Sequence, residues 1–442
     1  MAEGEETRRA IERAARQSYG KLLAFLAART RDVAAAEDAL AEAFASALAR
    51  WPQQGVPRAP EAWLLTVARR RASDAARRRR TQVDAAGPLV LLADELQAAT
   101  VASDIPDDRL RLMFACAHPA VEPAARAPLI LQTVLGLDAS TIASAFLVAP
   151  ASMGQRLVRA KRKIRDAGIP FRVPERDELN DRLGAVLETI YAAFAEGWSD
   201  PAGTLPRRRD LAEEAIWLGR LVVTLLPDEP EALGLLALML HAEARRGARR
   251  DTGGRYVPLA EQEPVCWDSA LIDEAEAALA RAGAMGRIGR FQLEAAVQSA
   301  HAARRLTGRT DWAAILELYD ALLAQTGSPV VAINRAVAMT ELRGAAAGLA
   351  LLDDLAVDRR LAEYQPYWAA RAGLLARVGD AAAADHAYEQ AVALEADPAV
   401  RRFLQDCRAR LHSTPAGGRR SHGRGAHDPG CRGRIDRLRR KP

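Results

Sequence analysis

The sequence predicts an all-α protein. Alanine and leucine dominate, runs of β-branched residues are few, and nearly every long segment places apolar residues at spacings of three and four. The 442 residues are 49% hydrophobic and 27% charged, which is typical of soluble globular chains. That length predicts about two to four domains. We therefore expect several helical domains in series.

The net charge of +5 hides an uneven distribution along the chain. Residues 1–170 contain 25 basic and 19 acidic residues, whereas residues 171–412 contain 28 basic and 36 acidic residues. Residues 413–442 contain 9 basic and 2 acidic residues. A basic front half joined to an acidic back half indicates an anion-binding module fused to a part with another role.

The first helical block is expected over residues 10–80. Thr30 or Asp32 is a plausible N-cap, and Pro60 suits the first turn of the following helix. The helix between them should bury one stripe, formed by Leu40, Phe44, Ala47, Leu48 and Trp51.

The helix at 61–80 carries seven arginines within residues 64–80. Helical spacing predicts that one side packs inward, through Leu64, Leu65, Val67, Ala68, Ala72 and Ala75. The opposite side presents Trp63, Thr66, Arg70, Asp74 and Arg77, flanked by Arg69, Ser73 and Arg80. Cations that follow phosphates beside an aromatic ring suit single-stranded or melting DNA. The alternative is a solvated arginine-rich helix end with Trp63 in the core.

A linker is expected at 81–106, followed by a second helical block at 107–170. Within it, a short helix at about 139–146, a three-residue turn and a helix opening near Pro150 form the layout of a helix-turn-helix. The second helix should turn Met153, Leu157, Ala160 and Ile164 inward. Its opposite face carries Ser152, Gln155, Arg156, Arg159 and Lys163, which suit base edges and phosphates, as do Lys161 and Arg162. An amphipathic basic helix pair without that role is the alternative.

Residues 175–411 are expected to form helical pairs, with turns at Gly344 and at Gly379–Asp380. The last unit resembles a tetratricopeptide repeat, so we expect a tetratricopeptide-like array. Residues 251–268 interrupt it. Candidates for a contact in this loop are Asp251, Gly253, Gly254, Arg255, Tyr256, Gln262, Trp267 and Asp268. The alternative is a connection between repeats with a buried Trp267. The basic tail, 412–442, lacks a core-forming pattern and is expected to be disordered.

Several classes of protein are disfavoured by missing patterns. The N-terminal residues do not resemble a signal peptide, and no apolar run reaches the length of a membrane span. The four cysteines lie far apart and form no CxxC pair, which favours a reducing cytoplasm. The sequence has no HExxH, GxxxxGK[ST] or GxSxG pattern. We therefore expect no enzyme activity, no metal and no cofactor.

The order of these parts resembles an alternative sigma factor of the extracytoplasmic-function type, a subunit of bacterial RNA polymerase. DVAAAEDALAEAFASALARW is similar to the region 2 helix that docks on the polymerase clamp, and PEAWLLTVARRRASDAARR to the helix that melts and recognises the −10 element. Residues 107–164 are similar to region 4, which recognises the −35 element. The phrase AFLVAPASMGQRLVRAKRKIR resembles a subgroup with a tetratricopeptide-like C-terminal extension, and DTGGRYVPLAEQEPVCWD resembles a motif of that extension.

This resemblance implies binding to the clamp and flap regions of core RNA polymerase and to promoter DNA. Asp38, Glu42 and Phe44 become the candidates for polymerase docking, with a solvated acidic face and a core Phe44 as the alternative. The extension is expected to modulate activity, either by folding against the front half or through a partner. Two positions depart from the pattern: Arg70 stands where the family often has Asn, and Gly154 lies inside the recognition helix.

The competing interpretation is a helix-turn-helix regulator with a partner-sensing helical array, which would not associate with core polymerase as a sigma subunit. It accounts for residues 139–165 and for the back half. It does not account for the acidic-aromatic helix and the arginine helix that precede them.

Overall fold

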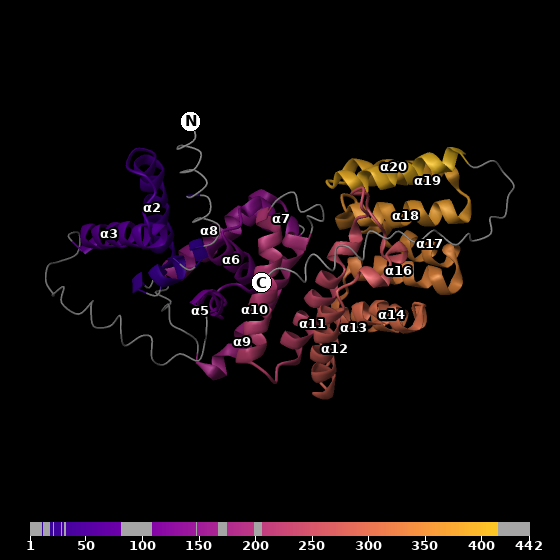
Figure 1. Cartoon of the computed structure of the whole chain (residues 1–442), viewed down its shortest axis with the longest axis horizontal. Coiled ribbons are helices and arrows are strands. Elements are labelled where there is room, and N and C mark those ends of the chain that lie inside the picture. The colour runs from indigo at the N-terminus through magenta and orange to yellow at the C-terminus, as the bar shows by residue number, and fades with distance from the viewer. Residues whose placement is uncertain are drawn as a thin grey trace. The chain divides into compact units, whose positions relative to one another are not determined.

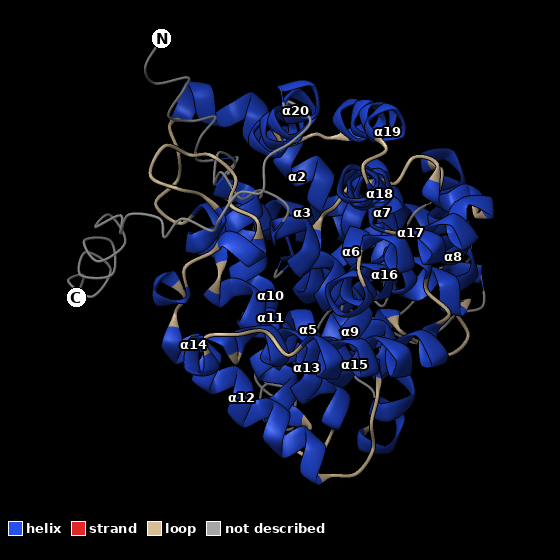
Figure 2. Cartoon of the chain, turned by 90° about the vertical axis from the view of Figure 1, so that its right-hand side faces the viewer, coloured by secondary structure: helices blue, strands red, loops and turns tan. Residues whose placement is uncertain are grey.

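The computed structural model is helical throughout the part of the chain that it describes (Figure 2). The described residues are 11, 18–20, 22–27, 29–30, 32–80, 108–146, 148–166, 175–198 and 206–413. Within them no strand forms, and the only β-type pairing is an isolated antiparallel bridge between Arg250 and Tyr256. The all-α prediction is confirmed. The expected linker at 81–106 and the tail beyond residue 413 lie outside the described residues.

The chain divides into two compact units, which are treated separately below. Unit 1 comprises residues 1–197 and 210–225, and unit 2 comprises residues 198–209 and 226–442. The domain boundary that the sequence suggested at residue 175 therefore falls inside unit 1.

After helical residues within 11–30, unit 1 contains two packed helices, α2 (Val33–Gln54) and α3 (Pro60–Arg80) (Figure 1). Asp32 caps α2, because its carboxylate accepts the backbone N–H of Ala35 at 3.1 Å. Gly55 ends the helix with a φ of 78°, a conformation that side chains rarely adopt. As predicted, α3 begins at Pro60.

The buried stripe of α2 differs from the predicted one at two positions, because Phe44 is only partly buried and Leu48 is exposed. Leu40, Ala47 and Trp51 are buried as expected, but Leu48 is 57% exposed. Ala43 is fully buried in the same stripe. A position eight residues after Leu40 drifts by about 80° around the helix, so Leu48 leaves the inward face while Ala43 and Ala47 stay on it.

The next part of unit 1 contains four helices. They are α5 (Asp108–Cys116), α6 (Pro123–Leu135), α7 (Ala139–Ala145) and α8 (Pro150–Asp166). Helix α8 packs against both α6 and α7. Asp138 starts α7, since its carboxylate accepts the N–H groups of Ser140 and Thr141, each at 2.9 Å. These helix positions match the predicted short helix, turn and longer helix.

Unit 1 ends with α9 (Arg176–Trp198), up to Gly197, and with most of α10 (Pro206–Leu225). One buried polar contact ties α9 to the preceding helices. The guanidinium of Arg182, only 2% exposed, donates to the carbonyl of Phe114 at 3.2 Å, and Phe114 is itself fully buried. Helix α9 is therefore part of the core of unit 1, although the sequence assigned it to the extension.

Unit 2 stacks helices in chain order, each on its neighbour. The α-helices are α11 (Pro230–Ala244), α12 (Ser269–Ala284), α13 (Arg290–Ala302), α14 (Arg304–Thr307), α15 (Trp312–Thr326), α16 (Pro329–Arg343), α17 (Ala345–Asp354), α18 (Gln365–Val378), α19 (Ala381–Leu394) and α20 (Pro398–Ser413). Short 3₁₀ turns are η1 (Arg246–Arg249), η2 (Leu259–Glu261), η3 (Pro264–Cys266), η4 (Leu355–Val357) and η5 (Arg359–Leu361). The predicted turns at Gly344 and Gly379 both occur, each with a positive φ.

Candidate functional site

The outward face of α3 carries the predicted cations. Arg69 and Arg70 are exposed, and neither forms a hydrogen bond or an ion pair with another residue that the structure describes. Asp74 is also exposed. The hydroxyl of Thr66 donates to the carbonyl of Ala62 at 2.8 Å, one turn earlier in the same helix. Arg77 belongs to α3, but its side chain lies outside the described residues.

Trp63 lies between the core and the open face of α3. Its ring meets Trp51 edge-to-face, with centroids 5.4 Å apart, and it stays partly exposed while Trp51 is buried. One end of the indole is therefore fixed by packing, and the rest is accessible beside the arginines. This placement combines features of both sequence interpretations, the core residue and the stacking platform.

The three docking candidates on α2 have different surroundings. Asp38 is exposed. Glu42 is exposed too and forms an ion pair with Arg71 of α3 at 3.3 Å. Phe44 is partly buried and stacks on Tyr19 with ring centroids 6.4 Å apart. Leu48, one helical turn after Phe44, is also exposed on α2, although the sequence predicted that this apolar side chain would be buried.

Helix α8 has one buried face and one open face, as the sequence predicted. Met153, Leu157, Ala160 and Ile164 are each at most 7% exposed. The open face includes the exposed residues Ser152, Gln155, Arg159, Arg162 and Lys163. None of these five forms a hydrogen bond or an ion pair with another residue in the described part of the chain. Their polar groups remain available to a ligand.

Two predicted DNA contacts on α8 are held by the protein instead. Arg156 donates to the carbonyl of Ala124 at 3.2 Å. Lys161 forms a partly buried ion pair with Glu37 of α2, with 2.7 Å between Nζ and Oε2. Burial raises the pKa of Glu37, and the hydrogen bond from Lys161 partly opposes that effect. The sequence analysis missed Glu37, because nothing in its local pattern identifies a partner 124 residues away.

In unit 2, the loop candidates mostly organise the loop itself. Asp251 accepts the N–H groups of Gly253 and Arg255, each at 2.9 Å, and pairs with the Arg255 guanidinium at 2.8 Å. The backbone hydrogen bond from Arg255, followed by the bond from the Arg255 side chain, lowers the pKa of Asp251. Gly254 has a φ of 76°. This turn is ordered but exposed, so its backbone is accessible.

The rest of the loop packs into unit 2. Tyr256 meets Phe403 of α20 edge-to-face, with centroids 5.5 Å apart. Gln262 is buried and donates to the carbonyl of Val257 at 3.1 Å. Trp267 is 4% exposed and lies under the guanidinium of Arg304, while Asp268 caps α12. The buried Trp267 agrees with the alternative of a connection between repeats.

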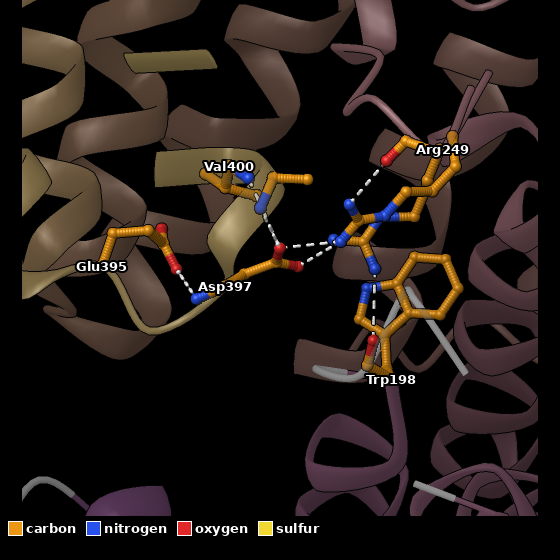
Figure 3. Close-up of polar contacts among 8 residues, drawn as sticks. Trp198, Arg249, Glu395, Asp397 and Val400 are labelled. Atoms are coloured by element: carbon orange, nitrogen blue, oxygen red, sulfur yellow. Dashed lines mark hydrogen bonds and ion pairs between the residues drawn. The ribbon is translucent and has the colours of Figure 1, made fainter. Parts of the chain in front are cut away.

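The sequence analysis also missed the contact that anchors this loop (Figure 3). Arg250 donates to both carboxylate oxygens of Asp397, at 2.7 and 2.5 Å, across 147 residues of sequence. Asp397 also accepts the N–H groups of Ala399 and Val400 at the start of α20. An Asp directly before a Pro is a recognisable helix start, but its pairing with Arg250 has no local signal.

No group of side chains suited to a metal ion accompanies these surfaces in the described residues. There, no three His, Cys, Asp or Glu side chains cluster as they would around a metal ion. A separate search of the same residues finds no helix with the length and apolar character needed to cross a membrane.

Two family models match separate segments of the chain. The Sigma-70 region 2 family matches residues 14–82, which include α2 and α3. A family of unknown function (DUF6596) matches residues 182–283, from Arg182 in α9 to the end of α12. An uncharacterized protein of Rhizobium meliloti is 38% identical over 406 residues, covering 90% of this chain and 94% of that protein. No solved structure matches.

Helices α2 and α3 therefore lie in a Sigma-70 region 2 domain near the front of this helical chain, which supports a sigma-70 family factor. The chain is a member of the same family as the Rhizobium protein, with which it shares nearly its whole length.

Proposed function

We propose that this chain is an alternative sigma factor that binds core RNA polymerase and directs initiation at particular promoters. The observation that carries this proposal is the open face of α3, with Arg69 and Arg70 beside the half-exposed Trp63, inside the region matched by Sigma-70 region 2. Cations beside a fixed aromatic ring can hold the backbone of a melted strand and stack one of its bases.

In this proposal α2 provides the polymerase contact through Asp38, Glu42 and Phe44. Helix α8 serves as the recognition helix of region 4. Gln155 and Arg159 suit contacts with base edges in the major groove, and Lys163 suits a phosphate. Since these side chains have no partner among the described residues, binding DNA would break no internal contact. Lys161 differs, because it would first have to leave Glu37.

The experiment is reconstitution with core RNA polymerase, followed by run-off transcription from the chain's own upstream region. A sigma factor co-purifies with the core enzyme and gives a discrete transcript. Arg69→Ala and Arg70→Ala should reduce the transcript while polymerase binding persists. Arg309→Ala, which removes an exposed arginine in unit 2, is the matched control. Tight binding to duplex DNA without polymerase association would favour the helix-turn-helix regulator instead.

We further propose that the extension modulates this activity. Because Arg182 in α9 is bonded to the core of unit 1, truncation before residue 175 would remove part of that core as well. A chain ending after Leu225 keeps unit 1 and removes nearly all of unit 2. Higher transcription from this truncated chain would indicate an inhibitory extension, and lower transcription an activating one. Unchanged transcription would exclude both roles.

A further inference from the structure

One partly buried cation in unit 2 has no carboxylate partner among the described residues. Arg245, at the end of α11, donates from Nε to the carbonyl of His241 at 3.3 Å and from Nη2 to the side-chain oxygen of Gln298. Both acceptors are neutral. Among the described residues Arg245 forms no ion pair with a carboxylate, although its side chain is largely removed from water.

The other charges near Arg245 increase the excess of positive charge. Burial first, and then the charges of Arg249 and Arg304, lower the pKa of Arg245 to about 10. These two arginines already have their own acceptors. Arg249 donates to the carbonyl of Trp198 at 3.1 Å, as Figure 3 shows, and Arg304 donates to the carbonyls of Leu259, Ala260 and Gln262.

The nearby carboxylates are also engaged elsewhere. Glu294 pairs with Arg290 at 2.7 Å. Glu276 accepts the hydroxyl of Ser299 and lies 3.5 Å from His241. Asp273 pairs with Arg305 at 2.6 Å. A partly buried guanidinium without a charged partner keeps part of its desolvation cost, which an anion bound beside it would offset.

Two hydrogen-bonding side chains lie next to Arg245 on adjacent helices. His301 follows Gln298 by three residues on α13, so both are on the face that meets Arg245. The His301 ring contacts Trp312 edge-to-face, and Tyr319 lies seven residues further along α15, on the same side as Trp312. His301 and Tyr319 are partly exposed, and neither forms a hydrogen bond to another described residue.

Both side chains are neutral near pH 7. Burial, followed by the charges of Arg245 and Arg304, lowers the pKa of His301 to about 4. Burial raises the pKa of Tyr319 to about 12, with a further contribution from Glu294. The imidazole therefore offers one N–H and the phenol one O–H, beside the unused N–H groups of a guanidinium fork.

We propose that the polar face shared by α11, α13 and α15 binds a small molecule through its carboxylate or phosphate group, with Arg245, His301 and Tyr319 as the donors. A guanidinium fork binds two oxygens of either group, and the two neutral donors can complete the contacts without adding charge. The extension would then be a ligand-sensing part of the chain. This role is independent of the proposed sigma activity.

The test is thermal unfolding of the full-length chain with inorganic phosphate or succinate as the probe, at constant ionic strength set with potassium chloride. Each probe is titrated over at least two decades of concentration, since the rise in Tm grows with the logarithm of ligand concentration above Kd. A bound probe should raise Tm by about 2–4 °C once its concentration is about tenfold above Kd. A response to phosphate alone indicates a phosphate ligand, and a response to succinate alone indicates a carboxylate ligand.

Two variants and a control connect the response to the site. Arg245→Lys keeps the charge but removes the guanidinium fork. The affinity for the probe should therefore fall by about tenfold or more, with a smaller rise in Tm at each probe concentration. His301→Gln keeps a donor of similar reach, and binding should persist with weaker affinity. Arg309→Gln should respond like the wild-type chain, because Arg309 is exposed and outside this face. No rise in the Tm of the wild-type chain with either probe at constant ionic strength, or an equal rise for Arg245→Lys, overturns the proposal.

Discussion

Helix α8 of unit 1 and the chain segment that follows helix α11 of unit 2 both carry dense positive charge. The two regions place that charge in opposite ways. Helix α8 buries one stripe and leaves Arg159, Arg162 and Lys163 exposed. Helix α11 is buried nearly all round, and the arginine run that follows it is bound by the protein itself. A cluster of arginines in a sequence is therefore not by itself a sign of a nucleic-acid surface.

The difference follows from what surrounds each helix. On α8, charged side chains project from a helix covered on one side only, so water can solvate them. After α11, the chain turns within unit 2, where each guanidinium needs an acceptor from a carbonyl, an aromatic face or a carboxylate. Arg245, like Arg249, has only neutral acceptors among the described residues, whereas Arg250 pairs with the carboxylate of Asp397.

The largest expected effect is on the bond that holds this arginine run. Asp397→Ala leaves Arg250 largely buried without its carboxylate and also removes the acceptor at the start of α20. We expect a loss of about 2–4 kcal/mol in the free energy of unfolding of unit 2, measured by denaturant titration. Asp385, which pairs with Arg408 on the surface, provides the matched control, and Asp385→Ala should cost clearly less. Equal losses would mean that burial of the pair is unimportant.

The same bond predicts a dependence on pH. Burial raises the pKa of Asp397, but the hydrogen bonds from Arg250, Ala399 and Val400 outweigh it, so the folded pKa lies below the ordinary value of 3.8. The stabilisation is therefore present above pH 4 and is lost as the pH falls through the folded pKa. The stability difference between the wild-type chain and Asp397→Ala should shrink over that acid range.

Sequence patterns predicted those features that depend on neighbouring residues. The inward stripe of α8 is an example, because helical period alone places Met153, Leu157 and Ala160 on one side. The start of α3 at Pro60 is another. On α2 the same reasoning failed at Leu48, where the stripe was extended too far along the helix, and Phe44 is only partly buried.

Features that depend on distant residues were not predictable in this way. Glu37 and Lys161 are joined across 124 residues, and Arg250 and Asp397 across 147. The assignment of α9 to unit 1 rests on Arg182 reaching a carbonyl 68 residues earlier. In the loop at 251–268, residues that suggested a docking site by composition are largely used to build unit 2. Local pattern cannot distinguish these two uses.

A smaller effect is expected from Gly234, where α11 packs closely against α13. A Cβ added at Gly234 would lie 2.6 Å from the backbone nitrogen of Gln292 in α13, which is too close without a shift of that helix. Gly234→Ala should therefore destabilise unit 2 by about 1–3 kcal/mol, despite the higher helix propensity of alanine. Denaturant unfolding measures the change. A stabilised variant would show that α11 and α13 can separate more easily than this contact implies.

The smallest expected effect concerns the corresponding glycine of α8. No atom lies within 4 Å of a Cβ added at Gly154, so the structure has room for the methyl group. Gly154→Ala should stabilise unit 1 by about 0.5–1 kcal/mol, because it removes the entropic penalty of glycine inside a helix. Circular dichroism during thermal unfolding checks this expectation.

The same variant also tests the role of α8 in binding DNA. Gly154 precedes Gln155 on a helix whose open face is proposed to enter the major groove. If the glycine serves only the fold, Gly154→Ala should bind promoter DNA as tightly as the wild-type chain, or more tightly as the helix becomes firmer. If affinity falls while stability rises, the missing side chain is needed for close approach of the DNA. If stability does not rise, the added methyl group must meet an obstacle that cancels the gain in helix propensity. Gly154 would then no longer contrast with the closely packed Gly234.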